Sequence, residues 1–473
     1  MQIIDTIYID GAFVTPHGDE LFDLVNPSTE QVIGRVRLAD AEDARAAIAA
    51  AKRAFPAFSR TGKAERVALL RRMHAAVVAK ENELFEAIIE EYGAPVSRGR
   101  WMASHASDVL LQMANTLENY SFVRRAGSAE VVMQPLGVAG LITPWNSNAG
   151  FICGKLAAAL AAGCTAVIKP SEMSAIQTRV ITEALHEAGL PAGVFNIVTG
   201  RGETVGAEIS SNPDIAKISF TGSTAVGKTI LRTAADTLKR VTLELGGKSP
   251  MIVLDDANFD EAVPLALQAG FMNSGQACIA GTRILVPQAR LAEFEQKMAD
   301  AVADIQSGDP RDPRTSIGPM VNQKQWERVQ RYIRIGVEEG ARLIAGGEGR
   351  PSGAEAGWYV RPTVFSDVRN DMTIAREEIF GPVLSIIAYQ DTEDAIRIAN
   401  DTPYGLQAYV CSTDATRASA VASQIEAGRV LVNTLAHEPA APFGGFKQSG
   451  IGREYGTFGL EAFLEPKSLL GAV

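Results

Sequence analysis

The sequence predicts a two-lobed α/β fold, and three observations support this prediction. The 473 residues are about three times the commonest domain length, so more than one lobe is expected. From residue 138 onward, β-rich runs alternate with segments of helical composition; these runs are VAGLI, TAVIKP, VFNIV, AKISF and RVTLEL. A second alternating region extends from about residue 250 to residue 433. Such alternation predicts parallel sheets with helices on both faces.

The residues before the first β-rich run predict helices that pack on the first lobe. Residues 40–55 begin with Asp40, a plausible cap, and residues 63–92 carry apolar side chains at helical spacing before Gly93. Residues 119–133 are polar, turn-rich and β-like. Together with the tail 463–473, they predict an arm that pairs with another subunit.

Composition narrows the class of protein. Apolar residues make up 46% and charged residues 21%, as in ordinary globular proteins, and the net charge of −10 without a dense basic stripe argues against nucleic acid as a partner. The apolar stretch 151–168 is interrupted by Lys155 and predicts a buried helix and strand rather than a membrane span. No signal-peptide pattern opens the chain. The four cysteines lack zinc-ligand spacing, so we expect no metal and a reducing, cytoplasmic setting.

Polar residues follow several of the predicted strands. In open parallel sheets, ligands bind beyond the carboxyl ends of the strands, where Asn146, Lys169, Gly222 and Glu244 stand. Each also has a plainer interpretation. Asn146 fits a turn after Pro144, Glu244 fits a surface or cap position, and Lys169 fits a solvated turn.

A phosphate-binding loop is the best interpretation of GSTAVG, residues 222–227. This loop lies between the predicted strand AKISF and a predicted helix, whose N-terminal amides could face a pyrophosphate. It lacks the full GxGxxG fingerprint, so the spacing alone is weak evidence. Glu172 in KPSE follows the strand TAVI and could reach a ribose hydroxyl, with a solvated turn as the alternative.

Cys278 is the candidate nucleophile. It lies in FMNSGQACIAGTR, where small neighbours leave the sulfur accessible and a nearby helix start could lower its pKa. A single cysteine is more often a small buried apolar residue, and we keep that interpretation for Cys153, Cys164 and Cys411, which lie in apolar or alanine-rich stretches.

Seven motifs, taken in order, resemble those of the aldehyde dehydrogenase superfamily over residues 26–467: TPWNSN, IKPSE, FTGSTAVG, LELGGKSP, GQACIAGTR, EEIFGPV and PFGGFKQSGIGRE. The resemblance implies a Rossmann-type cofactor domain (residues 1–118 and 136–246) and a second α/β catalytic domain (residues 247–440). An oligomerisation arm and C-terminal segment (residues 119–135 and 441–473) would complete a homodimer or homotetramer.

The resemblance also implies roles for individual residues. Cys278 would be the nucleophile and Glu244 the general base, while Asn146 and the Cys278 backbone N–H would form an oxyanion hole. Lys155 would tune Glu244 or relay protons, although Thr457 stands where some relatives have a glutamate of that relay. The implied cofactor site consists of Trp145, Lys169, Ser171, Glu172, Gly222, Ser223, Gly227, Leu245, Gly246, Glu378 and Phe380.

The activity implied is oxidation of a small-molecule aldehyde to an acid through a thioester. NAD is expected over NADP, because Glu172 would repel a 2′-phosphate, an effect that Lys169 partly offsets. Two alternatives stay open: a relative that transfers the acyl group to coenzyme A, against which Glu244 argues, and a non-catalytic member of the family.

The substrate tunnel is expected to be roomy and to favour aromatic or extended aldehydes. Ser147 and Gly154 stand where several relatives have bulky aromatics, with Phe151 between them. His437 and Glu438 could lie at the tunnel mouth, or they could be solvated loop residues.

Overall fold

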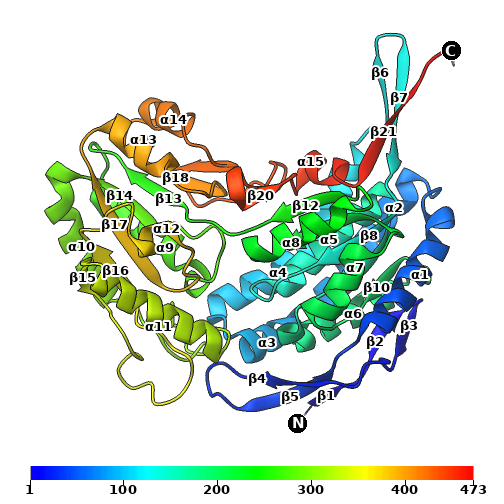
Figure 1. The fold of residues 1–473 in the computed structure, drawn as a ribbon, viewed down its shortest axis with the longest axis horizontal. Coiled ribbons are helices and arrows are strands. Elements are labelled where there is room, and N and C mark those ends of the chain that lie inside the picture. Colours follow the sequence, from blue (N-terminus) through cyan, green and yellow to red (C-terminus); the bar gives the residue numbers. More distant parts are fainter. Residues whose placement is uncertain (1, 472–473) are drawn as a thin grey trace.

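Two sheets with their helices form two lobes, which lie side by side (Figure 1). The computed structural model describes residues 2–471. A three-stranded sheet projects from the first lobe, close to the C-terminal end of the described chain. The expected α/β fold is confirmed.

The first lobe contains an eight-stranded sheet in the order β20-β12-β11-β8-β9-β10-β2-β3. Its five central strands are parallel, whereas β20 and β2 pair antiparallel with their neighbours. Burial on both faces explains why these strands read as continuous apolar runs. The strands are β2 (Ile7–Ile9), β3 (Ala12–Val14), β8 (Val138–Ile142), β9 (Thr165–Lys169), β10 (Phe195–Ile197), β11 (Ile215–Thr221), β12 (Arg240–Glu244) and β20 (Gly450–Ile451).

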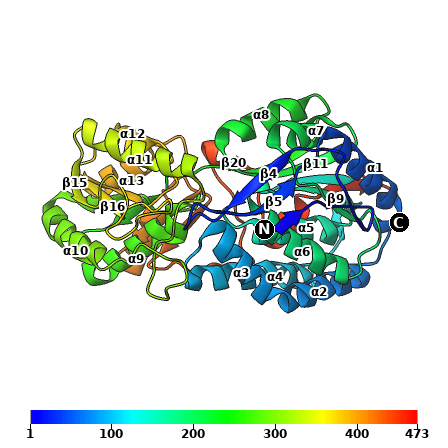
Figure 2. The same ribbon diagram turned by 90° about the horizontal axis from the view of Figure 1, so that it is seen from below.

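Helices cover both faces of this sheet, with α7 and α8 on one side and α2, α4 and α6 on the other (Figure 2). A small sheet in the order β1-β5-β4 lies at the start of the chain. The elements are α1 (Ala41–Phe58), α2 (Lys63–Ala79), α3 (Glu81–Tyr92), α4 (Val96–Glu118), α5 (Asn148–Ala162), α6 (Ala175–Glu187), α7 (Ala207–Ser211), α8 (Thr224–Ala235), β1 (Gln2–Ile4), β4 (Leu21–Val25) and β5 (Val32–Arg37).

The N-terminal helices confirm one prediction and correct another. Asp40 caps α1, and its side chain accepts hydrogen bonds from the backbone N–H groups of Glu42 and Asp43. The single helix expected over residues 63–92 is wrong, because the chain leaves helical geometry at Lys80 and starts again as α3. Glu81 and Glu83 in the first turn of α3 interact favourably with its N-terminal dipole, which stabilises this second start.

The second lobe contains a seven-stranded sheet in the order β15-β16-β17-β14-β13-β18-β19. All neighbouring strands are parallel except β15 and β16. The elements are β13 (Pro250–Val253), α9 (Phe259–Phe271), β14 (Arg283–Pro287), α10 (Leu291–Ala303), α11 (Gln323–Glu338), β15 (Arg342–Ala345), β16 (Thr363–Ser366), α12 (Thr373–Arg376), β17 (Val383–Tyr389), α13 (Thr392–Asn400), β18 (Gln407–Cys411), α14 (Ala415–Ala422) and β19 (Arg429–Val432).

The β-like arm expected from the sequence is present as a projecting sheet. Strands β6 (Val123–Ala126) and β7 (Ala129–Pro135) form a hairpin, and β21 (Leu464–Leu469), which follows α15 (Gly456–Glu461), pairs antiparallel with β7. Its pairing with another subunit stays a prediction. Among residues 2–471, no helix is long and apolar enough to cross a membrane.

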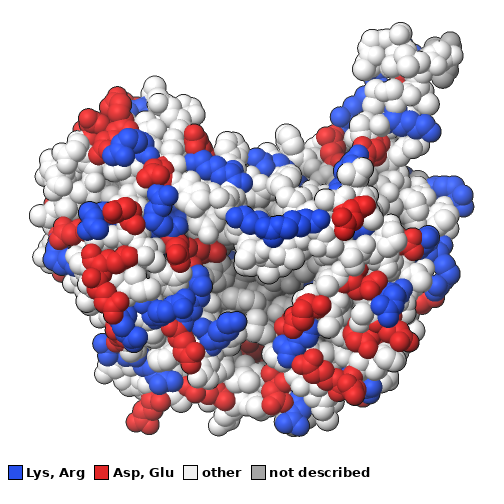
Figure 3. Space-filling view, in the orientation of Figure 1, with Lys and Arg blue, Asp and Glu red and all other residues white. Residues whose placement is uncertain are grey.

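The topology brings the predicted strand ends to one edge of the first sheet. The backbone N–H of Thr143, after β8, donates to Lys169 O, and the N–H of Gly222, after β11, donates to Glu244 O. This edge faces the hollow between the lobes, whose visible floor is mostly uncharged while its rim carries charges of both signs (Figure 3).

Candidate active site

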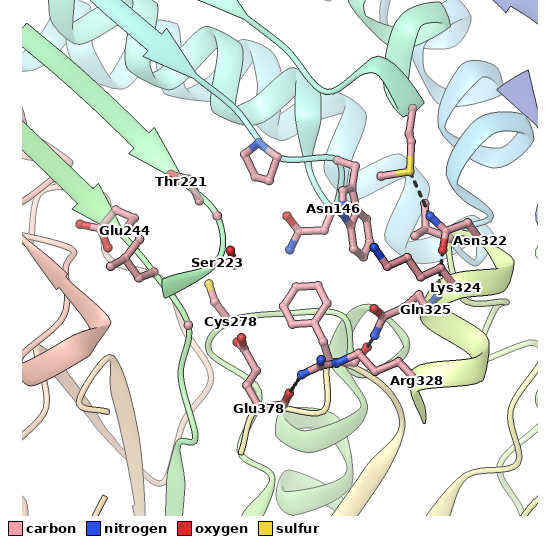
Figure 4. A pocket seen from close by; sticks show the side chains of 18 of the residues that line it. Asn146, Thr221, Ser223, Glu244, Cys278, Asn322, Lys324, Gln325, Arg328 and Glu378 are labelled. Carbon is pink, nitrogen blue, oxygen red and sulfur yellow. Dashed lines mark hydrogen bonds between the residues drawn. The ribbon is translucent and has the colours of Figure 1, made fainter. Parts of the chain in front are cut away.

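An inter-lobe cleft of about 750 Å³ contains most of the predicted site residues. Figure 4 shows Asn146, Ser223, Glu244, Cys278 and Glu378 around it. Several strand-end loops of the first lobe and two loops of the second meet here. The predicted residues that line it are Trp145, Asn146, Gly222, Ser223, Glu244, Leu245, Gly246, Cys278, Glu378 and Phe380.

The loop that carries Cys278 is held in an unusual backbone conformation. Asn273, Ser274 and Gly275 have φ values of 55°, 59° and 73°, all in the left-handed region. A Cβ on Gly275 would lie 2.2 Å from the carbonyl of Gly381, so only glycine allows this loop to approach the loop after Glu378. The left-handed conformation is costly for Asn273 and Ser274, which are not glycines, and the close packing of the two loops keeps it in place.

The environment of Cys278 differs from the one expected. No helix begins at Cys278; the residue lies in a turn before β14. Burial, together with the carboxylates of Glu378 and Glu244, raises the pKa of the Cys278 thiol to about 12. The expected lowering by a helix start is therefore wrong, and the sulfur needs a base to become a thiolate. Cys153, Cys164 and Cys411 are buried, as expected.

Asn146 is tied to the cysteine loop. Its Nδ2 donates to Gln276 O at 2.9 Å, and Asn273 Nδ2 donates to Asn146 O at 3.0 Å. These bonds fix the amide of Asn146 beside the segment that leads to Cys278. An amide donor held in this way can stabilise a negative oxygen without reorganisation.

Glu244 is almost fully buried at the end of β12. Its side chain is 2% exposed, and neither carboxylate oxygen has a hydrogen-bond partner among residues 2–471. Burial and the nearby Glu454 carboxylate raise the pKa of Glu244 well above its usual value, although Lys155 opposes this shift. A carboxyl group with a raised pKa can exchange a proton near neutral pH.

Lys155 lies near Glu244 in a polar cluster with Ser219 and Glu454, two residues that the sequence analysis missed. Its Nζ donates to Ser219 Oγ at 2.9 Å and forms an ion pair with Glu454. Thr457, where the resemblance led us to look for a relay glutamate, is exposed on α15. The carboxylate beside Lys155 is thus Glu454, the last residue of the motif PFGGFKQSGIGRE, and that motif could have revealed it.

Four predicted cofactor residues do not line the inter-lobe cleft. Lys169 Nζ donates to Pro170 O at 2.9 Å and contacts the Glu172 carboxylate at 3.3 Å. Ser171 Oγ accepts a hydrogen bond from its own loop. Gly227 packs helix α8 against Leu245, since a Cβ there would lie 2.5 Å from the leucine Cδ2. Arg201, which the sequence analysis missed, also pairs with Glu172, at 3.4 Å.

Helix α11 forms a wall of the cleft that the sequence analysis did not identify. Gln325 Nε2 donates to Phe380 O at 2.7 Å, and Arg328 Nη2 donates to Glu378 O at 2.5 Å (Figure 4). These bonds position Glu378, whose Oε1 accepts from Gly247 N at 3.1 Å. Burial raises the pKa of Glu378 to about 7.

Comparisons with known proteins agree with this geometry. The model of the aldehyde dehydrogenase family matches residues 13–469. The chain belongs to the aldehyde dehydrogenase family. It is 46% identical over 98% of both chains to a 3-succinoylsemialdehyde-pyridine dehydrogenase of a Pseudomonas species.

Solved structures give the same result. Aldehyde dehydrogenase C of Pseudomonas syringae, a mutant in complex with NAD+ and octanal, is similar with a TM-score of 0.98 and 45% identity, covering 99% of this chain and 97% of that one. An aldehyde dehydrogenase of Mycobacterium tuberculosis in complex with NAD+ has a TM-score of 0.96 and 40% identity, covering 99% and 98%.

A second cavity of this aldehyde dehydrogenase, about 280 Å³, also reaches Cys278. It shares Asn146, Phe151 and Glu244 with the inter-lobe cleft. Among the residues expected in a tunnel, Ser147, Phe151 and His437 line it. The Glu438 carboxylate instead accepts from Ala440 N at 2.9 Å.

Gly154 lines a different space. It faces a third cavity of about 30 Å³, which also contacts Lys155 and Glu454, and Phe151 borders all three spaces. The placement of Gly154 in the tunnel is therefore not supported by the structure. Helix geometry explains this, because Gly154 lies almost two turns beyond Ser147, the residue before α5, whereas Gly150 and Phe151, in the first turn of α5, line the cavity that reaches Cys278.

Proposed function

We propose that this enzyme oxidises an aldehyde to the carboxylic acid with NAD, through a thioester on Cys278. The observation that carries the proposal is the position of Cys278, where the inter-lobe cleft and the second cavity meet beside Asn146 and Glu244. One space would hold the cofactor and the other the aldehyde, with the sulfur between them.

The residues of the inter-lobe cleft fit a dinucleotide. A Cβ on Gly246 would lie 2.6 Å from the Glu378 carboxylate, so glycine keeps that space open, and the buried Thr221 Oγ1 has no partner among the described residues. Ser223 would contact the pyrophosphate, Glu378 the nicotinamide-side ribose, and Lys169 with Glu172 the adenine-side ribose. NAD bound here supplies the acceptor for the hydride that leaves the thiohemiacetal carbon. The Pseudomonas syringae and Mycobacterium tuberculosis relatives were solved with NAD+.

Acylation begins with the Cys278 thiol. Its raised pKa means that a base takes the proton as sulfur attacks the carbonyl carbon, and Glu244 is the nearby carboxylate able to do so. The carbonyl oxygen becomes negative as the C–S bond forms. Asn146 Nδ2 and the Cys278 N–H stabilise it, and one such donor contributes roughly 2.7 to 4 kcal/mol in the transition state.

Hydrolysis then needs a base for water. Glu244, once it has released the proton of Cys278, takes a proton from the water that attacks the thioester. The C–S bond then breaks, and the leaving sulfur takes that proton to restore the thiol as the acid is released. We infer that the ion pair of Lys155 and Glu454, whose charges both act on Glu244, provides the route by which Glu244 loses the proton of Cys278 before hydrolysis. Glu244 is the residue that favours water over coenzyme A as the acyl acceptor.

The lobes take corresponding roles in this proposal. Residues 1–118 and 136–246 bind NAD, residues 247–440 supply the nucleophile, and residues 119–135 with 441–473 form the arm and C-terminal segment. The arm would pair with another copy of the chain in a homodimer or homotetramer. Its three strands leave edges that a partner can extend.

Formation of NADH in the presence of an aldehyde tests the proposal. We expect turnover with octanal and NAD that is unchanged when coenzyme A is added, with free octanoate as product. Acyl-coenzyme A as the main product would identify the acylating branch. Absence of NADH across a panel of aliphatic and aromatic aldehydes would indicate a non-catalytic member.

A further inference from the structure

Two arginine side chains line the second cavity without an acidic partner. Arg98 comes from α4 in the first lobe and Arg429 from β19 in the second. Among residues 2–471, neither guanidinium forms an ion pair. The chain as a whole has a net charge of −10, so an uncompensated positive cavity is a local feature that needs its own explanation.

Arg98 has no hydrogen-bond partner in the described part of the chain. Its guanidinium carbon lies 4.0 Å from the centre of the Trp101 ring, and its Nε is buried without a partner. Burial lowers the pKa of Arg98 to about 10, so it stays charged at neutral pH. A stacked arginine with free N–H groups is well suited to bind a planar anion in two-pronged fashion.

Arg429 is held only by neutral partners. Its Nε donates to Gln407 Oε1 at 2.6 Å, and its Nη1 donates to His437 Nδ1 at 3.0 Å. Burial and the adjacent Arg429 charge lower the pKa of His437, which keeps the ring neutral as this hydrogen bond requires. The guanidinium is therefore oriented, but its charge is not balanced.

A row of aromatic side chains, Trp101, His105 and His437, connects the two arginines. The His105 ring stacks on Trp101 at 4.5 Å and lies 6.2 Å from the His437 ring. Burial, His437 and Arg98 lower the pKa of His105 to about 4, so this histidine is neutral at pH 7. Arg98 and Arg429 thus belong to one continuous wall.

The rest of the cavity supplies no acidic partner for either arginine. Glu244 is the only acid among its described lining residues; it also lines the inter-lobe cleft, and neither of its carboxylate oxygens contacts Arg98 or Arg429. Apolar side chains such as Phe151, Leu435 and Phe443 form much of the remaining lining. An extended apolar chain with one negative end would match these surfaces.

We propose that the substrate is an aldehyde with a carboxylate at its other end, which Arg98 and Arg429 bind while the aldehyde lies at Cys278. This inference rests on the proposed function and specifies its substrate class. The carboxylate supplies the charge that the cavity lacks, and hydrogen bonds between a guanidinium and a carboxylate are about twice as strong as those between neutral groups.

Matched pairs of aldehydes test the inference in the full-length enzyme. We expect kcat/KM for 7-oxoheptanoate, which is heptanal with a carboxylate as its last carbon (its ω-carboxylate form), to exceed that for heptanal by about 10- to 100-fold. This factor corresponds to the free energy of a hydrogen bond between charged groups. Arg98→Gln and Arg429→Gln should each remove most of this preference, and Arg98→Lys should retain part of it. The same comparison for butanal and for octanal, each with its ω-carboxylate form, shows at which chain length the preference in kcat/KM is largest.

Arg100→Gln is the matched control. Arg100 lies on the same helix and contacts Phe85, outside the second cavity, so this variant should keep the wild-type preference. Equal kcat/KM for heptanal and its ω-carboxylate form in the wild type would overturn the inference and leave aldehyde oxidation established.

Calorimetric binding of adipate separates the inference from the proposed function. We expect binding that weakens with salt, is lost in Arg98→Gln and persists in Arg100→Gln. If no aldehyde produces NADH, the proposed function fails, and this binding alone still supports the anion site. If no aldehyde produces NADH, absence of adipate binding overturns the inference as well.

Discussion

The inter-lobe cleft and the second cavity meet at Cys278, but they are built in different ways. In the first lobe, the cleft is lined by loops that directly follow β8, β11 and β12. Beyond the residues that it shares with the cleft, the second cavity collects side chains from α4, α5, β18, β19 and residues 435–443. The first kind of site follows from the topology of a parallel sheet, whereas the second depends on how helices and lobes pack.

The two spaces also differ in charge. The cleft pairs Glu378 with groups that bind or balance it, including Gly247 N and the charge of Arg328. The second cavity has two guanidinium groups, and among residues 2–471 no acid pairs with either of them. The cleft is suited to a ligand that many backbone groups contact. The second cavity is suited to a ligand whose negative charge contributes most of its binding.

Removal of the Cys278 sulfur, where the two spaces meet, should have the largest effect on the rate of aldehyde oxidation. We expect Cys278→Ala to lower aldehyde oxidation at least about ten-thousandfold, because the nucleophile is lost, while the Kd for NAD stays about the same. Steady-state kinetics and calorimetry measure the two effects. Cys411→Ala, a buried cysteine on β18, is the control and should remain active. Substantial oxidation by Cys278→Ala would refute the role of this cysteine.

Glu244→Gln should slow hydrolysis about 100- to 10,000-fold, the usual contribution of a general base. Because burial raises the pKa of Glu244, its basic form is lost as pH falls through that raised value. We therefore expect wild-type kcat to rise with pH across the neutral range, and this rise to disappear in Glu244→Gln. The exposed Glu438→Gln serves as the control.

Stopped-flow measurement of NADH separates acylation from hydrolysis in these variants. A burst that persists in Glu244→Gln places the residue mainly in hydrolysis. A burst that shrinks in parallel with kcat shows that Glu244 also takes the proton of Cys278. A wild-type kcat that does not change with pH contradicts the assigned role.

The contrast between the two spaces explains what the sequence could predict. The strand-end residues were found because a buried parallel strand reads as an apolar run, and Asn146, Gly222 and Glu244 each follow one. Arg98 and Arg429 were missed because nothing local distinguishes them from surface arginines; only the packing of α4 against the second lobe brings them together. Glu454 was missed although its motif was recognised.

The fold shows the same division. The alternation of strands and helices predicted both sheets, but not the break at Lys80, where neither glycine nor proline interrupts the helical pattern. The pKa of Cys278 was also expected in the wrong direction. Sequence spacing gives no measure of burial, and burial is the main reason that this pKa rises.

A smaller effect is expected at the edge of the cofactor site. Glu172→Ser leaves Lys169 and Arg201, which both contact the glutamate in the wild type, beside the ribose position. We expect the ratio of kcat/KM for NADP to that for NAD to rise about tenfold, because a carboxylate that repels a 2′-phosphate is removed. Glu183→Ser on α6 is the control. An unchanged ratio would show that Glu172 does not face the ribose.

The smallest effect on substrate choice should come from Gly154→Trp, and it tests whether Phe151 separates the second and third cavities. An indole does not fit a space of about 30 Å³, so the variant should lose about 1 to 3 kcal/mol of stability by overpacking. Hydrolysis should slow a few-fold, because the ring presses on Lys155 and Glu454. The ratio of kcat/KM for octanal to that for acetaldehyde should change little. Ser147→Phe, which fills the second cavity itself, should lower that ratio strongly. If Gly154→Trp changes the size preference more than Ser147→Phe, the two spaces form one tunnel when substrate binds.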